Sequence, residues 1–103
     1  NLFVIIDYNK MQSYGSLNEV LSLEPLSDKW KSFGFNVYQV EGHSVKELKK
    51  TFEHASVLDK NPKAIICKTI KGKGLSIAEN NPQWHHKRLS DEELEMMRTE
   101  WQT

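Results

Sequence analysis

Residues 1–15 read NLFVIIDYNKMQSYG, an apolar run that stops abruptly at Asp7-Tyr8-Asn9 and then becomes polar. Leu2 to Ile6 are five consecutive apolar residues, three of them β-branched, which is typical of a short strand buried on both faces of a parallel sheet. We therefore predict a central strand over residues 2–6. The polar residues after it mark the carboxyl end of that strand.

Two helices are predicted between this strand and the next. Ser16 and Glu19 have the spacing of a capping box, which predicts a short helix ending near residue 22. A second helix is predicted from about residue 27, with Leu26, Trp30 and Phe33 on one face and Gly34 as its stop. The chain between the first strand and the first helix, residues 13–15, is predicted to be a loop.

A second strand and a third helix follow. Residues 35–40 alternate in a way that favours a strand of mixed exposure, and residues 41–43 form the turn after it. Ser44 and Glu47 form another capping box, and Val45, Leu48 and Phe52 recur at helical spacing. Residues 64–70 then predict a third, buried strand.

The order strand, helix, helix, strand, helix, strand predicts an α/β fold with a largely parallel sheet in three layers. A long loop over residues 71–89 and a last helix capped by Ser90 complete the chain. In such sheets ligands bind beyond the carboxyl ends of the strands. Functional residues are therefore sought just after each strand.

The overall composition names no partner. Fourteen basic residues balance fourteen acidic ones, which argues against nucleic acid or an anionic membrane as a partner. The single cysteine, Cys67, forms no disulfide within the chain, and a cytoplasmic location is expected. No apolar run approaches the roughly 20 residues that span a bilayer. Because the chain enters a strand directly at Asn1, we expect it to be a piece of a longer polypeptide.

Asn9 is the first candidate site residue, and two interpretations of it stay open. Its amide oxygen, just past a strand end, is a suitable ligand for a divalent cation. On spacing alone, however, Asp7-Tyr8-Asn9 is more commonly simple turn chemistry, because Asn and Asp favour strand ends.

The candidate site residues later in the chain also have more than one interpretation. Gly72-Lys73-Gly74 suits either a close backbone approach to phosphate or a flexible turn. Of the adjacent His85 and His86, at most one is expected to point into a site, and an idle, exposed histidine is the commoner case. His43 and His54 are interpreted as structural or solvated, and Cys67 as inert packing.

Taken together, five stretches resemble the transketolase family: residues 4–15 (VIIDYNKMQSYG), 24–30 (EPLSDKW), 40–43 (VEGH), 68–74 (KTIKGKG) and 79–86 (ENNPQWHH). The resemblance spans nearly the whole chain in order, and it is strongest to the amino-terminal subunit of split bacterial transketolases. It implies that residues 1–103 are the C-terminal portion of a thiamine-diphosphate-binding (PP-type) domain. The implied reaction is transfer of a two-carbon ketol unit from a ketose phosphate to an aldose, as in the pentose phosphate pathway.

The resemblance also implies roles for individual residues. Asn9 matches the Asn that ends the family's diphosphate motif, so its side chain and the Met11 carbonyl would coordinate Mg²⁺ or Ca²⁺ beside thiamine diphosphate. His85 matches a loop histidine near the diphosphate and the donor sugar, with a catalytic role in hydrogen bonding or proton relay. The family usually has Gly after this histidine, and His86 stands there instead.

Other parts of the implied site are expected outside these residues. The Gly-Asp-Gly half of the motif is expected upstream, and the pyrimidine side of the cofactor on a second domain or subunit. A homodimer or heterotetramer that acts on sugar phosphates is therefore implied. Two alternatives are kept: a 1-deoxyxylulose-5-phosphate synthase or other thiamine enzyme, and a non-catalytic partner subunit that retains the fold.

Overall fold

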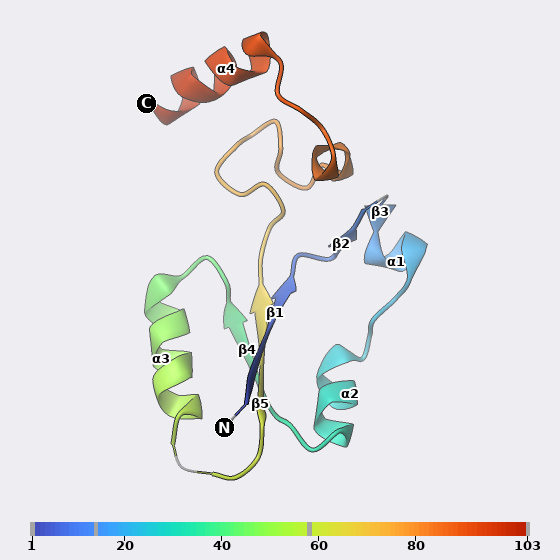
Figure 1. Cartoon of the computed structure of the whole chain (residues 1–103), viewed down its shortest axis with the longest axis vertical. Coiled ribbons are helices and arrows are strands. Elements are labelled where there is room, and N and C mark those ends of the chain that lie inside the picture. Colours follow the sequence, from blue (N-terminus) through green and yellow to red (C-terminus); the bar gives the residue numbers. More distant parts are fainter. Residues whose placement is uncertain (1, 14, 58, 103) are drawn as a thin grey trace.

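The structure is a computed structural model that describes residues 2–13, 15–57 and 59–102 (Figure 1). Three parallel strands form its main sheet: β1 (Phe3–Tyr8), β4 (Asn36–Glu41) and β5 (Lys63–Lys68). The helices are α1 (Leu17–Val20), α2 (Leu26–Ser32), α3 (Val45–Ala55) and α4 (Asp91–Trp101). The predicted α/β fold with a parallel sheet is confirmed.

The middle of the sheet is β5 and not β1, so the predicted central position of the first strand is wrong. The strand order is β1-β5-β4, and Ile5 on β1 is 59% exposed while Ile65 on β5 is fully buried. Both strands have the apolar run of a buried strand, and that pattern does not tell which one lies in the middle. β1 also extends further than predicted, because Asp7 and Tyr8 continue its pairing with β5.

The helices α2 and α3 lie on opposite sides of the three strands (Figure 1). Leu48 and Phe52 of α3 pack against the cluster of Val40, Ile65 and Cys67, as their helical spacing predicts. On α2, Leu26 and Trp30 are half-buried and the Trp30 ring meets Phe35 edge-on at 4.8 Å.

Two residues predicted on buried helix faces are instead exposed. Phe33 is 77% exposed, because it is the C-cap of α2, where the chain leaves the helix and turns through Gly34 at a φ of 84°. Val45 is 80% exposed because it opens α3 at the end away from the contact with β5. Hydrophobic periodicity therefore overestimates the buried faces at helix ends.

The amino end of β5 is locked by a buried lysine. The Lys63 ammonium donates to the Asp59 carboxylate at 2.8 Å, to the Asp59 carbonyl at 3.1 Å and to the Asn61 carbonyl at 2.8 Å. A buried ammonium is tolerated only when its hydrogen bonds are satisfied, as they are here. The hydrogen bonds of Lys63 therefore stabilise the amino end of the sheet. A ligand site is sought at the opposite, carboxyl end.

Two small elements were not predicted. Met11–Gln12 (β2) and Gly15–Ser16 (β3) pair as a short antiparallel ladder, so these residues are not a plain loop; Tyr14 of the predicted loop lies outside the described residues. Within the predicted 71–89 loop, Pro82–His85 form a 3-10 helix, η1. None of the described helices is long and apolar enough to cross a membrane.

Candidate functional site

The parallel register places three segments side by side at the carboxyl edge of the sheet. Tyr8 and Glu41 are both register partners of Lys68, so the three strands end at the same level. The residues that follow them therefore leave the sheet at one edge. This is the position at which ligands bind in open parallel sheets.

Asn9 is held in a tight turn at this edge. Its Oδ1 accepts a hydrogen bond from the Met11 backbone N–H at 2.9 Å, and Lys10 between them has a φ of 59°. An amide oxygen has two lone pairs, so this bond leaves one acceptor position on Asn9. The turn interpretation of Asn9 is therefore correct, and it leaves the metal-ligand role possible for the same atom.

His85 is brought to the same turn by η1. Its Nε2 lies 3.1 Å from the Ser13 hydroxyl oxygen, within hydrogen-bonding distance. His85, Asn9, Met11 and Ser13 line a common cavity of about 220 Å³. The three residues that the sequence singled out for cofactor binding thus meet around one space, although His85 lies far along the chain from the other two.

The neighbouring His86 takes a different place. Its ring meets that of His85 nearly at right angles, with 4.4 Å between the ring centroids. His86 is not among the lining residues of the cavity that holds Asn9 and His85. Of the two histidines, His85 lines this cavity, and the prediction that at most one of them points into a site stays a prediction.

A second cavity of about 480 Å³ adjoins Asn9 on the other side. It is lined by residues from the ends of all three strands: Asp7, Asn9, Gly42, His43, Thr69, Ile70, Lys71 and Gly72. Lys71 lines both this cavity and the one that holds His85. A lysine at the junction of two cavities is a natural counter-charge for a phosphate group.

Gly72, the first glycine of the Gly-Lys-Gly stretch, lies where no other residue fits. Its φ is +72°, and a Cβ there would lie 2.4 Å from the Ala78 carbonyl oxygen, so only glycine fits. Gly72 lines the second cavity, whereas Gly74 has open space around it. Gly72 thus allows a close approach to the backbone of Ala78, and Gly74 belongs to a turn in which its N–H donates to the Glu79 carboxylate at 3.0 Å.

Sequence reasoning missed His43, Thr69 and Lys71 as site residues. His43 was interpreted as structural or solvated, and it is indeed exposed with its Nε2 accepting the Ile70 backbone N–H at 2.8 Å; what the sequence did not show is that it lines the second cavity. The Thr69 hydroxyl donates to the Asp7 carboxylate across the strand ends. Their position in the sequence was the available signal, because each lies within three residues after the end of a strand.

A third cavity of about 590 Å³ opens between Asn9 and the first helix, and its lining includes Tyr8, Lys10, Glu24 and Lys68. The Tyr8 hydroxyl donates to Glu24, which raises the pKa of Tyr8 and lowers that of Glu24. Glu24 thus stays ionised and fixes the Tyr8 ring at the end of β1.

Two further predictions concern residues away from the site. Burial and the nearby Asp7 carboxylate raise the pKa of the Cys67 thiol, so the thiol stays protonated and packs in the core, as expected. His54 packs edge-on against Tyr38, with 5.8 Å between ring centroids. Neither residue takes part in the cavities around Asn9.

The amide oxygen of Asn9 and the nearby backbone carbonyl oxygens are neutral oxygen ligands of the kind that a hard cation binds. Among the described residues, no group of three or more His, Cys, Asp or Glu side chains is placed to hold a metal ion. A cation here would therefore take Asn9 and backbone oxygens from this chain and complete its shell of about six oxygens elsewhere. Diphosphate oxygens are the kind of ligand that such an incomplete shell accepts.

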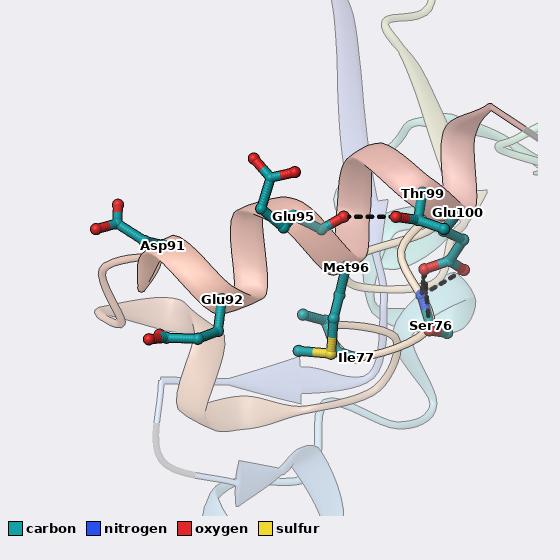
Figure 2. A pocket seen from close by; sticks show the side chains of 8 residues that line it. All are labelled: Ser76, Ile77, Asp91, Glu92, Glu95, Met96, Thr99 and Glu100. Carbon is teal, nitrogen blue, oxygen red and sulfur yellow. Dashed lines mark hydrogen bonds between the residues drawn. The ribbon is translucent and has the colours of Figure 1, made fainter.

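Another cavity, of about 880 Å³, lies between α4 and residues 76–77 and shares no lining residue with those at the strand ends (Figure 2). Its walls include Asp91, Glu92 and Glu95, and Glu100 accepts hydrogen bonds from the Ser76 N–H and hydroxyl, both at 3.0 Å. These four carboxylates stand without a lysine or arginine among the lining residues, whereas Lys10, Lys68 and Lys71 line the cavities at the strand ends, and only the latter offer positive charge to a diphosphate. We therefore place the candidate site at the strand ends.

Comparison with known families and proteins shows what this chain is similar to. The family model described as "Transketolase, thiamine diphosphate binding domain" matches residues 1–103. A transketolase crystal structure from Campylobacter jejuni is similar in fold, with a TM-score of 0.85 and 26% identity. The similarity covers 96% of this chain and 15% of that one.

Curated relatives are similar in sequence as well. A 6-deoxy-6-sulfo-D-fructose transketolase subunit from Clostridium sp. (strain MSTE9) is 40% identical over 92 residues, which is 89% of this chain and 34% of the relative. An apulose-4-phosphate transketolase subunit from Phocaeicola vulgatus is 40% identical over 86 residues, 84% of this chain and 31% of the relative. The chain thus spans about a third of the length of these relatives.

Proposed function

Because the chain belongs to the family of transketolase thiamine diphosphate-binding domains, we propose that it forms the metal and diphosphate side of the cofactor site in a transketolase-type enzyme. In this proposal it is the C-terminal portion of the PP-type domain. The enzyme transfers a two-carbon ketol unit from a ketose phosphate to an aldose. The observation that carries the proposal is the cavity in which Asn9, Met11 and His85 meet.

Asn9 and Met11 hold the metal in this proposal. The free acceptor position of the Asn9 Oδ1 and the Met11 carbonyl would be the ligands of this chain to Mg²⁺ or Ca²⁺, and the ion would neutralise charge on the diphosphate. The Asn9 Oδ1 is already oriented by the Met11 N–H, so little side-chain freedom is lost on binding. Lys71, which lines both adjoining cavities, balances the charge of the diphosphate.

Thiamine diphosphate, when bound, supplies the carbanion chemistry that breaks and forms the carbon–carbon bonds. The protein binds, orients and moves protons around it. His85 is the residue of this chain proposed for proton transfer or hydrogen bonding to the sugar, because an imidazole serves both roles near neutral pH. The contact between its Nε2 and the Ser13 hydroxyl fixes the direction in which the ring points.

The pyrimidine side of the cofactor is proposed to come from a second subunit or domain. The two bacterial relatives described above are both named as transketolase subunits. A heterotetramer or homodimer with sugar phosphates as substrates follows from the proposal. A cytoplasmic location is part of the same proposal.

Replacing Asn9 by Ala tests the function. In the full polypeptide assembled with its partner, Asn9→Ala is expected to weaken thiamine diphosphate and Mg²⁺ binding by tenfold or more, about 1.4 kcal/mol. The fold should lose only about 1 kcal/mol, for the hydrogen bond to Met11. Isothermal titration calorimetry measures the affinities, and urea unfolding measures the stability.

Asn61→Ala is the matched control for this experiment. Asn61 is exposed and precedes β5 at the amino end of the sheet, so its replacement should leave cofactor affinity unchanged. An Asn9→Ala variant that binds thiamine diphosphate as tightly as the unaltered protein would sink the assignment.

A further inference from the structure

The imidazole of His43 makes a hydrogen bond across the carboxyl edge of the sheet. Its Nε2 accepts the backbone N–H of Ile70 at 2.8 Å. His43 follows β4 and Ile70 follows β5, so the bond joins two neighbouring strand ends. An accepting Nε2 carries no proton, and the proton of the neutral ring is therefore on Nδ1.

The backbone holds His43 in place for this bond. The Gly42 N–H donates to the Lys68 carbonyl at 2.7 Å. A Cβ on Gly42 would lie 2.5 Å from the Thr69 side chain, so the turn after β4 is pressed against the end of β5. This close contact places the next residue, His43, beside Ile70.

The backbone hydrogen bonds between β5 and its neighbouring strands end at Ile70. The Thr69 N–H still donates to the Tyr8 carbonyl of β1, at 3.3 Å. The next N–H, that of Ile70, has turned to the other side and bonds to a side chain instead of a strand. The His43 ring is thus bonded to the chain at the point where the chain leaves the sheet.

Lys71 and Gly72 follow Ile70 directly in the chain. Both residues line the cavity that also contains Asn9 and His43. The loop is then closed on itself by bonds from the Asn80 N–H to the Lys71 carbonyl at 2.9 Å and from the Lys73 N–H to the Ile70 carbonyl at 3.2 Å. A shift at Ile70 would move Lys71 relative to Asn9.

We propose that His43 is a positioning residue: its Nε2 accepts the Ile70 N–H and thereby holds Lys71 and Gly72 at the wall of the cavity that also contains Asn9, on the diphosphate side of the site. The inference rests on the proposed function, since the ligand it serves is a metal-bound diphosphate. His43 itself acts through the backbone of Ile70 and does not contact the reacting atoms. This role requires a hydrogen-bond acceptor at the position of the His43 Nε2. A side chain that only fills the space could not accept the Ile70 N–H.

Three substitutions at His43 separate these possibilities in the full polypeptide assembled with its partner. His43→Gln keeps an acceptor at the distance of Nε2, His43→Asn has its acceptor one carbon too short, and His43→Leu has none. Thiamine diphosphate affinity is measured by isothermal titration calorimetry at saturating Mg²⁺. Hydrogen exchange of the Ile70 amide is measured without cofactor. His54→Leu, at a histidine that contacts Tyr38 away from the site, is the control.

We expect His43→Leu and His43→Asn to bind thiamine diphosphate about tenfold more weakly, the effect of one hydrogen bond. Exchange of the Ile70 amide should accelerate by a similar factor in both. His43→Gln should stay within about twofold of the unaltered protein in both measurements, and so should His54→Leu.

Two results would overturn the inference. One is unchanged cofactor affinity in His43→Asn, which remains informative even where His43→Leu does not fold. The other is an equal loss in His43→Gln and His43→Asn, which would mean that ring packing and not the acceptor atom matters. If the unaltered protein binds thiamine diphosphate and His43→Asn binds it equally, only the inference fails. If the unaltered protein binds none, the proposed function fails as well.

Discussion

His85 and His86 are neighbours in the chain with different surroundings, and their replacements should differ accordingly. His85 lines the cavity with Asn9 and contacts Ser13, while His86 contacts the His85 ring. We predict that His85→Ala lowers kcat/KM about a hundredfold, the usual contribution of an acid–base group. His86→Ala should lower it by less than about tenfold, through a looser His85 ring.

A coupled assay of ketol transfer in the assembled enzyme measures both variants, and each should keep the unfolding midpoint of the unaltered protein. The opposite order of effects would mean that His86 and not His85 occupies the role that the sequence resemblance implies.

Asp59 couples the stability of the fold to pH. The hydrogen bond from Lys63 is the largest influence and lowers the pKa of Asp59 from 3.8; burial opposes it, and the Asn61 N–H and the Asn36 amide lower the pKa further. A carboxyl whose pKa is lower in the folded state stabilises the protein above its unfolded pKa, and this stabilisation is lost as pH falls through the folded pKa.

We therefore predict that Asp59→Asn lowers the urea midpoint at pH 7, and that the difference from the unaltered protein shrinks as pH falls below about 4. Asp28→Asn is the control, because the Asp28 carboxylate pairs with Lys31 on an exposed helix surface. A difference for Asp59→Asn that stays constant from pH 7 to pH 3 would contradict this account.

The turn between β4 and α3 depends on Gly42 for its fit against β5. A Cβ on Gly42 would meet the Thr69 side chain at 2.5 Å and the Lys68 carbonyl oxygen at 2.9 Å. Gly42→Ala should therefore lower the free energy of unfolding by about 1–3 kcal/mol, as overpacking does elsewhere. Urea unfolding of the full polypeptide measures the loss.

Gly15→Ala is the matched control for Gly42→Ala. The closest atom to a Cβ there is the Glu19 carboxylate oxygen at 3.2 Å, the end of a flexible side chain that can move. Its cost should be within about 0.5 kcal/mol. Equal costs at the two glycines would show that the close contact at the end of β5 is not rigid.

Local patterns predicted most of the larger elements. The capping serines of α3 and α4 accept the expected N–H groups of Glu47 and Glu93. The two-residue strands β2 and β3 were missed because such short segments carry no periodicity. The position of each strand in the sheet was also missed, because it depends on pairing between residues far apart in the chain.

The site was predicted only in part, for a related reason. Asn9, Met11 and His85 were identified through a family resemblance, and the structure brings them around one cavity. His43 was not identified as a site residue, because its bond is to Ile70, 27 residues away. That contact exists only because β4 and β5 are parallel and end at the same level.

The shape of the whole chain is flat and open. Its radius of gyration is 16.8 Å, and its extents are 51 × 32 × 16 Å. A compact domain of this length would have a radius of gyration of about 13 Å. Leu2, Ile5 and Trp101 are large apolar side chains that remain exposed. Such a surface is suited to being covered by further protein.

We therefore predict that this polypeptide without its partner, supplied with Mg²⁺ and thiamine diphosphate, shows no ketol transfer in a coupled assay. The proposed site has only its diphosphate side here, and the pyrimidine side would have to come from another subunit. Activity should appear when the partner is added. Turnover by the polypeptide alone would contradict the two-subunit arrangement.

The strand order β1-β5-β4 has a consequence for the order of events during synthesis. A ribosome makes β1 first and β5 last, yet β5 occupies the middle of the sheet. Because domains fold as they emerge at about 5–20 residues per second, β1 and β4 wait for several seconds without their common partner. The pairing of β1 and β4 through β5 cannot begin before β5 has been synthesised, so the two earlier strands stay open to chaperones and to mispairing until then.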